Sequence, residues 1–225
     1  MKLTKVIFIR HGEADGNIDR VFHGHYNSDL TENGVRQIKL TAERLRDTNI
    51  DAIYSSDLKR TYKTAEAIAQ GRNMEIITDE RLREINGGQW EDVPWDELPN
   101  KFPESYGFWL NNPLHVQMPD GESMIEFQNR IYDAVQEKIN KHIGKVLCIV
   151  THGTALRVLL CKYHNKSLSD LAEIAWNDNA SITVVEYDDK LSPKIVVAGD
   201  NGHLGDYSTL AKQSWWRKTD KKGDN

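Results

Sequence analysis

The 225-residue chain has few cysteines and no long apolar run. Two cysteines, Cys148 and Cys161, are too few for a disulfide framework. No segment approaches the roughly 20 apolar residues of a membrane-spanning helix, and the apolar run at residues 6–9 is too short for a signal peptide. The formal net charge of −5 gives no reason to expect a polyanion such as nucleic acid as a partner. We therefore expect a cytoplasmic protein with no membrane or nucleic-acid partner.

The length and the alternation of patterns predict one α/β domain over residues 1–211, followed by a polar tail over residues 212–225. Apolar strands alternate with amphipathic helices, which favours a doubly wound, mostly parallel sheet in a three-layer α/β/α sandwich. Strands are expected at residues 4–10, 51–55, 74–78, 145–151, 180–187 and 194–198. The predicted helices include one capped by Thr31, with Val35, Ile38, Ala42 and Leu45 on its apolar face, one carrying Leu58, Tyr62, Ala65 and Ile68, one capped by Ser123, and one after Gly153.

One stretch, residues 86–119, breaks this alternation. It contains prolines (Pro94, Pro99, Pro103 and Pro113) and tryptophans (Trp90, Trp95 and Trp109). Because proline interrupts regular elements, we expect an insertion of short helices and loops. The insertion is either an aromatic mini-core that covers the sheet or also a wall of the substrate pocket, and its place in such a fold favours the second interpretation.

Two histidines follow predicted strands in the same way. Arg10-His11-Gly12-Glu13 comes directly after the first apolar run, and Thr151-His152-Gly153 ends the run at 145–150. Ligands of open α/β sheets bind at the carboxyl ends of the strands. The two histidines can face each other only if their strands are close in space.

These motifs resemble the histidine phosphatase superfamily, in the branch that includes phosphoglycerate mutase. The resemblance rests on Arg10 to Glu13, Ser55 to Arg60, Glu84 and Thr151 to Gly153, and it runs over residues 3–205 in the order of the family. It implies the phosphoglycerate mutase-like fold, with the insertion over the active site. It also implies catalysis without a metal or cofactor.

The resemblance assigns a role to each candidate residue. His11 is the nucleophile that becomes a phosphohistidine, and Glu84 is the general acid. Arg10 and Arg60 bind the phosphate, together with His152, Asn17 and the backbone of Gly153, and His23 and Gly24 lie at the lip of the site.

Residue chemistry agrees with these roles. A neutral imidazole attacks phosphorus, so the other ring N–H of His11 should be held by an acceptor. Guanidinium forks match phosphate oxygens, and a helix N-terminus at Gly153 adds positive potential.

Several residues have weaker assignments. His23-Gly24-His25 has the His-x-His spacing of a zinc site, but no further ligand cluster completes one, and His25 is taken as a loop residue. His203 lies past the last predicted strand, and the sequence leaves open whether it reaches the site. Phe22, Tyr26, Trp90, Phe108 and Trp109 are candidates for an apolar wall.

Departures from the mutase pattern favour a phosphatase. Gly16 stands where mutases usually carry tryptophan, and the insertion is acidic and aromatic where theirs is rich in arginine. Gly88 to Asp92 resembles a segment of the small phosphatases, with Asp92 in place of glycine. The prediction is a metal-independent phosphomonoesterase acting on a small phosphorylated metabolite, with a homodimer as a possible assembly. The alternatives are a 2,3-bisphosphoglycerate-dependent mutase, a non-catalytic phosphoprotein-binding module and a metal-dependent hydrolase.

Overall fold

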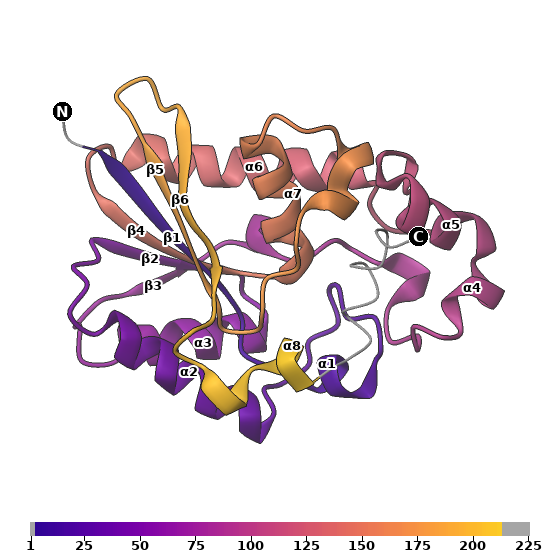
Figure 1. Ribbon diagram of the computed structural model, residues 1–225, viewed down its shortest axis with the longest axis horizontal. Helices are drawn as coiled ribbons and strands as arrows, with labels where there is room; N and C mark the ends of the chain where they lie inside the picture. Colours follow the sequence, from indigo (N-terminus) through magenta and orange to yellow (C-terminus); the bar gives the residue numbers. More distant parts are fainter. Residues whose placement is uncertain (1–2, 213–225) are drawn as a thin grey trace, which may run out of the picture.

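Six strands form one sheet in the order β3-β2-β4-β1-β5-β6 in the computed structural model, which describes residues 3–212 (Figure 1). The strands are β1 (Thr4–Arg10), β2 (Ala52–Ser55), β3 (Ile76–Thr78), β4 (Val146–Thr151), β5 (Ile182–Tyr187) and β6 (Pro193–Asp200). The first four are mutually parallel, and β5 runs antiparallel to both of its neighbours. The prediction of a mostly parallel sheet is confirmed.

Both faces of the central strands β1, β2 and β4 are buried, which explains why these strands are continuous apolar runs. Along β1, Val6 and Phe8 belong to one core, whereas Ile7 and Ile9 belong to the other. Helices α2 (Glu32–Leu45) and α3 (Lys59–Ala69) cover the second core, and α6 (Met124–Lys141) and α7 (Gly153–Tyr163) cover the first (Figure 1). The predicted α/β/α layering is therefore confirmed.

The helix starts follow the predicted caps. The Thr31 hydroxyl accepts a hydrogen bond from the Gly34 N–H, and Ser123 forms a reciprocal capping box with Glu126 at the start of α6. The apolar faces were predicted less well, because Val35 and Tyr62 are exposed. The stripe that α2 buries instead runs through Gly34, Gln37, Ile38, Thr41 and Leu45, so two polar side chains take part in it.

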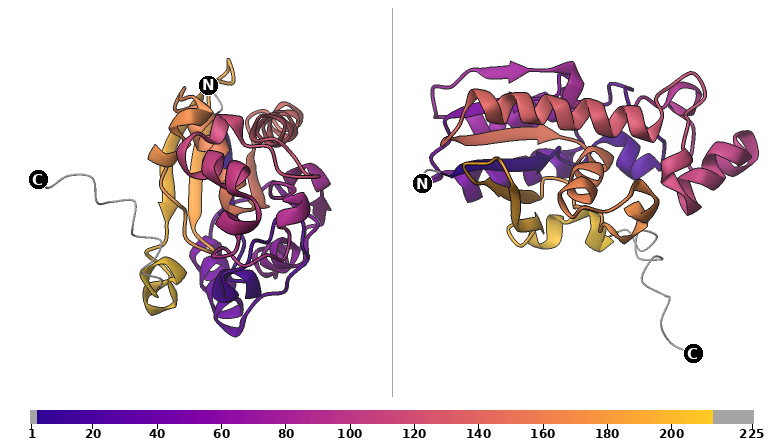
Figure 2. Two further views of the ribbon diagram at one scale, coloured as in Figure 1. Left: turned by 90° about the vertical axis from the view of Figure 1, so that its right-hand side faces the viewer. Right: turned by 90° about the horizontal axis from the view of Figure 1, so that it is seen from above.

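The insertion extends beyond the sheet at one end of the molecule (Figure 2). It consists of η2 (Gly88–Trp90), α4 (Leu98–Lys101), α5 (Pro103–Asn111) and η3 (Pro113–His115), in agreement with the short helices predicted there. Trp90 is fully buried and packs against Phe22, Trp95 and Trp109 at ring-centroid distances of 5.4–6.4 Å across the cluster. The segment is thus an aromatic mini-core with its own buried centre.

Short elements complete the described chain. They are α1 (Asp15–Asp19), which the sequence analysis did not predict, η1 (Glu80–Leu82), η4 (Leu168–Glu173), η5 (Gly205–Tyr207) and α8 (Thr209–Lys212). Residues 213–225 of the predicted tail lie outside the described residues. Cys148 and Cys161 are buried free thiols, and no helix within residues 3–212 has the length and apolarity needed to cross a membrane.

Candidate active site

The sheet register brings the two histidine motifs together. Arg10 at the end of β1 pairs with Thr151 at the end of β4, so His11 and His152 leave neighbouring strands at the same edge. Their ring centroids lie 5.2 Å apart in an edge-to-face arrangement. The expectation that the two strand-end histidines face each other is met.

His11 is fixed in one orientation at the cavity. Its Nδ1 lies 2.7 Å from the carbonyl oxygen of Gly12, and since a carbonyl can only accept, Nδ1 carries the proton. Nε2 is then the basic nitrogen, and His11 lines the cavity. Burial, together with the charges of Arg60 and Arg10, holds the pKa of His11 well below its usual value. The imidazole is therefore neutral at pH 7, as a nucleophile requires.

His152 is held through its other nitrogen. Its Nε2 lies 3.0 Å from the Ser56 hydroxyl, and the residue is the N-cap of α7. Nδ1 is buried and has no hydrogen-bond partner among residues 3–212. Burial and the nearby Arg60 also keep the pKa of His152 well below its usual value. The ring is neutral and packs against His11, which lines the cavity, but His152 is itself completely buried and is not among the described residues that line the cavity.

The two arginines are buried and oriented by backbone carbonyls. Arg10 Nη1 donates to the Asn177 carbonyl at 2.6 Å, while its Nε has no partner within the described part of the chain. Arg60 donates from Nη1 to the Tyr26 carbonyl at 2.6 Å and from Nη2 to the Gly24 carbonyl at 2.8 Å. Burial lowers the pKa of Arg60 to about 10, so the guanidinium stays charged at pH 7. Both groups line the cavity as fixed cations.

Glu84 lies in the same cavity, immediately after η1. Its Oε1 accepts from the Ile85 N–H at 3.0 Å and its Oε2 from the Thr154 N–H at 2.8 Å. Burial raises the pKa of Glu84 above its usual value, although these N–H groups and Arg60 oppose the shift. A carboxyl group that is protonated more readily than usual is suited to donate a proton.

The predicted lip residues, His23 and Gly24, belong to a loop that Glu91 organises, and of the two only His23 is among the described residues that line the cavity. The Glu91 carboxylate accepts hydrogen bonds from the backbone N–H groups of Gly24, His25, Tyr26 and Gly87. Gly24 holds Arg60 through its carbonyl, and a Cβ there would lie 2.1 Å from the Ile85 carbonyl oxygen, so only glycine fits.

His23 and Asn17 approach the cavity more directly. His23 lines it, contacts Asp92 at 3.3 Å through Nε2 and stacks on Tyr26. Asn17 also lines the cavity, and its Oδ1 accepts from the Ala14 N–H and from Asn179 Nδ2.

Comparison with known proteins shows the family of the chain. A family model described as the histidine phosphatase superfamily (branch 1) matches residues 6–200. The chain belongs to this superfamily. Phosphoserine phosphatase 1 of Hydrogenobacter thermophilus is 33% identical over 212 residues, which is 94% of this chain and 100% of that protein. A probable phosphoglycerate mutase GpmB of Yersinia pestis is 34% identical over 206 residues, or 90% and 95% of the two chains.

The solved structure of Bacillus stearothermophilus YhfR is also similar. It superposes with a TM-score of 0.86 at 33% identity, covering 89% of this chain and 99% of that one. The predicted family and fold class are therefore confirmed.

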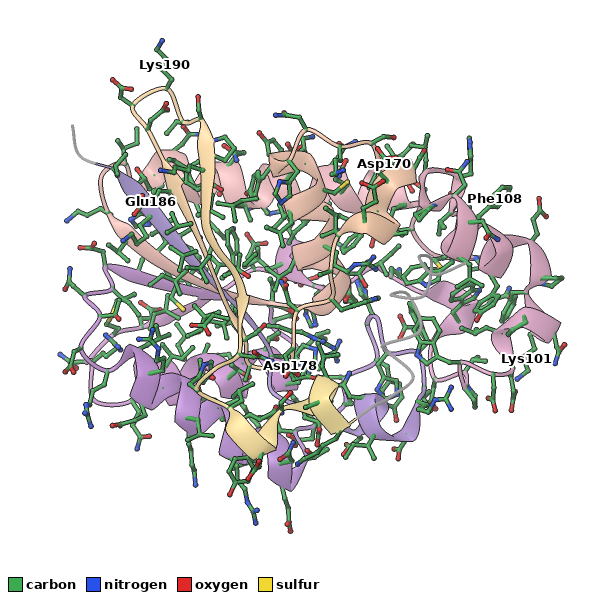
Figure 3. The ribbon with its side chains drawn as sticks, viewed as in Figure 1. Lys101, Phe108, Asp170, Asp178, Glu186 and Lys190 are labelled. Carbon is green, nitrogen blue, oxygen red and sulfur yellow. The ribbon has the colours of Figure 1, made fainter. Side chains whose placement is uncertain are left out.

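The apolar wall of this histidine phosphatase differs from the predicted one. Phe22 and Trp109 line the cavity as expected, together with Val21, Trp95 and Trp176. Trp90 is fully buried behind the wall, Tyr26 packs on His23, and Phe108 on α5 packs against His115 away from the cavity (Figure 3).

Two further histidines are placed outside the cavity wall. His203 does not reach the cavity: its Nε2 lies 2.9 Å from the Thr41 hydroxyl on α2. His25 is a loop residue, as predicted, and its Nε2 lies 3.1 Å from the Glu84 carbonyl.

The loop at residues 176–179 was not predicted to be part of the site. Asn177 and Asn179 bond to Arg10 and to the His11 carbonyl, and Asp178, buried near α8 (Figure 3), accepts from the Leu210 N–H and the Ser208 hydroxyl. Because β5 is antiparallel to β1, the loop before β5 lies at the carboxyl end of β1. Four polar or aromatic residues stand directly before the predicted strand at 180–187, and this was the sequence feature that could have indicated a part of the site.

Proposed function

We propose that the protein hydrolyses phosphate monoesters of small metabolites through a phosphohistidine formed on His11. The observation that carries the proposal is the state of His11. Its Nδ1–H is fixed on the Gly12 carbonyl, its ring is neutral, and its basic nitrogen is in a cavity that also contains Arg10, Arg60 and Glu84. A nucleophile, two cations and an acid are the groups that phosphoryl transfer to a histidine requires.

In the first step, His11 Nε2 attacks the phosphorus and the bond to the leaving oxygen breaks. Glu84 gives its proton to that oxygen, which leaves as an alcohol. Arg10 and Arg60 compensate the negative charge of the phosphoryl oxygens, and the N–H groups at the start of α7 add positive potential. His152, through Nδ1, is assigned one of the phosphoryl oxygens.

In the second step, ionised Glu84 takes a proton from a water molecule. The water oxygen attacks the phosphorus, and the P–N bond to His11 breaks. Phosphate leaves, His11 is neutral again, and Glu84 is protonated for the next cycle. In these two steps, described side chains supply all the positive charge that compensates the phosphoryl oxygens. The proposed reaction therefore requires no metal ion.

A mutase is the second candidate, because one of the similar proteins is named a probable phosphoglycerate mutase. A phosphoglycerate carries a carboxylate in addition to its phosphate. Among the described residues that line the cavity, the permanent cations are Arg10 and Arg60, and both face the place of the first phosphate. Gly16 and the aromatic wall supply no second anion site, which favours hydrolysis.

A screen of phosphorylated metabolites, run in excess chelator, tests the proposal. The panel includes sugar phosphates, nucleotides, phosphoserine and 3-phosphoglycerate, with a 2,3-bisphosphoglycerate-dependent mutase assay alongside. We expect phosphate release that survives the chelator and exceeds isomerisation. No turnover would indicate a binding module, loss in chelator a metal enzyme, and faster isomerisation a mutase. The cytoplasmic location and the homodimer stay predictions.

A further inference from the structure

The cavity has two chemically distinct halves. One half carries the groups assigned to the phosphate. We assign the apolar side chains of the lining to the leaving group and call them the leaving-group half. They are Val21, Phe22, Trp95, Trp109 and Trp176. None of the five ionises, and burial lowers the pKa of His23, which also lines the cavity, so the permanent cations of the described lining are the two arginines assigned to the phosphate.

One side of the leaving-group half is a packed aromatic cluster. The ring centroid of Phe22 lies 5.4 Å from that of Trp95 and 6.0 Å from that of Trp109, and the two tryptophans are 5.9 Å apart. Trp90, which is fully buried, supports all three from behind. Aromatic clusters of this kind hold their geometry through many contacts, so this wall is preformed.

A fourth aromatic ring of the lining, Trp176, comes from the loop before β5. The guanidinium of Arg157 lies 4.2 Å from the centroid of the Trp176 ring. Gly153 lets the Trp176 ring approach the backbone closely, since a Cβ on Gly153 would lie only 3.2 Å from Cζ3 of Trp176. Arg157 is itself held by the carbonyls of Ile174 and Leu171, at 2.9 and 2.6 Å. This buried cation therefore positions Trp176.

The open space continues past the two tryptophans. Trp109 and Trp176 also line a second, adjoining cavity, where apolar side chains such as Met124 alternate with the charged Arg157 and Glu173. A leaving group longer than that of phosphoserine thus has room beyond the pair, where it meets a mixed polar and apolar surface.

We infer that the substrate of this site carries an aromatic ring on its leaving group, seated between Trp109 and Trp176. The inference rests on the proposed phosphatase function and narrows its substrate class. A ring there is removed from water against aromatic surfaces, which is favourable. The carboxylate and ammonium groups of phosphoserine, or the carboxylate of a phosphoglycerate, would lose their hydration with no partner of opposite charge.

Two alkyl phosphates whose alkoxide leaving groups have similar basicity are compared. A difference in their kcat/KM then reports binding of the leaving group and not its chemical reactivity. Ethyl phosphate and phenylethyl phosphate differ by one phenyl ring, and O-phosphoserine supplies the charged comparison. We expect kcat/KM for phenylethyl phosphate to exceed that for each of the others by at least about tenfold, as burial of one aromatic side chain-sized group allows.

Variants show where the preference comes from. Trp109→Leu and Trp176→Leu should each reduce the ratio of phenylethyl to ethyl phosphate to within about threefold. Phe108→Leu is the matched control, because Phe108 belongs to the same insertion but lies outside the cavity, and it should retain the ratio. Thermal melting of each variant checks that the fold is intact.

The outcomes distinguish this inference from the proposed function. Equal or faster turnover of phosphoserine, or a ratio that neither tryptophan variant changes, overturns the inference while the phosphatase stands. Failure to turn over these three esters by a protein that hydrolyses another ester of the metabolite panel also overturns the inference alone, whereas no turnover of any ester overturns both.

Discussion

The ends of β1 and β4 carry similar motifs, but the structure gives their histidines different states. His11 and His152 both follow a buried strand, precede a glycine and have a pKa well below the usual value because of burial. His11 is fixed through Nδ1 by a backbone carbonyl and lines the cavity. His152 is fixed through Nε2 by the Ser56 hydroxyl, caps α7 and is completely buried.

This difference indicates which histidine is suited to act as the nucleophile. A carbonyl partner leaves no ambiguity about the proton, so His11 has a lone pair on Nε2. A hydroxyl partner both donates and accepts, so Ser56 allows either tautomer of His152. The proposed nucleophile is thus the ring with a single tautomer, and the proposed oxyanion partner is the ring that can adjust. The predictions below test this comparison, starting with the largest expected effect.

Removing each histidine should have unequal effects. His11→Ala should reduce kcat by at least about a thousandfold, because it removes the group that forms the covalent bond. His152→Ala should cost about a hundredfold, as loss of one transition-state donor typically does. Turnover of p-nitrophenyl phosphate measures both, with melting temperature as the check of the fold. A larger loss from His152→Ala would reverse the assignment.

Replacing the acid should depend on the leaving group. Glu84→Gln should slow an alkyl phosphate by a factor on the order of a hundred or more, because a basic alkoxide needs the proton. An aryl phosphate leaves as a stable phenolate and should be slowed much less. The measurement is kcat for both esters.

Glu13→Gln and Glu91→Gln are the matched controls for Glu84. Glu13 accepts hydrogen bonds from Thr31, Asn33 and Thr209, and Glu91 from four backbone N–H groups, so both carboxylates have structural partners. Leaving-group dependence in either control, with none in Glu84→Gln, would move the acid role to that residue.

The arginines should act as forks and not only as charges. Arg60→Lys keeps the positive charge but has no second arm to contact the carbonyls of Tyr26 and Gly24 together with a phosphate. We expect kcat/KM to fall about a hundredfold, and Arg10→Lys to behave similarly. Arg46→Lys, on an exposed arginine, is the control. Near wild-type kcat/KM in Arg60→Lys would place this group outside the phosphate site.

The dependence of kcat/KM on pH should show an acid limb from His11 and an alkaline limb from Glu84. Since the pKa of His11 is lowered, kcat/KM should stay high as the pH falls through 6.5 and decline only well below it. The pKa of Glu84 is raised above 4.5, so activity toward alkyl phosphates falls as the pH rises through that higher value. In Glu84→Gln the alkaline limb should disappear. An alkaline limb retained in that variant would contradict its assignment to Glu84.

The smallest effect concerns the partner of His152. Ser56→Ala removes the hydroxyl and leaves Nε2 of a buried ring without a bond, which should cost about tenfold in kcat/KM, or roughly 1–2 kcal/mol. Ser55→Ala is the neighbouring control, because the Ser55 hydroxyl donates only to the Ser56 carbonyl. Equal effects of the two substitutions would show that Ser56 acts through general packing.

Much of the fold and the phosphate half of the site was predictable from the sequence. Buried parallel strands are continuous apolar runs, so 4–10 and 145–151 were recognisable, and strand-end residues meet because the register is parallel. The short helix α1 was missed, since five residues give too little periodicity. The exposure of Val35 could not be predicted because Gln37 and Thr41 find buried partners that no periodicity indicates.

The aromatic half was harder to predict because it depends on packing between distant segments. Trp176 reaches the cavity because β5 reverses direction beside β1, and Trp90 is withdrawn from the cavity because five other aromatic rings pack against it. His203 follows the last strand, from where it could have turned toward the site, but it hydrogen-bonds to Thr41 on α2. These outcomes depend on strand order and direction, which a pattern of residues along one segment does not contain.

Trapping the phosphoenzyme shows directly which residue becomes phosphorylated. Protein is mixed with a phosphate-labelled monoester, denatured at alkaline pH and digested, and the labelled peptide is identified. We predict label on the peptide that contains His11, stable in base and lost in acid, absent from His11→Ala and present in His152→Ala. Label on His152, acid-stable label, or label that persists in His11→Ala would contradict this prediction.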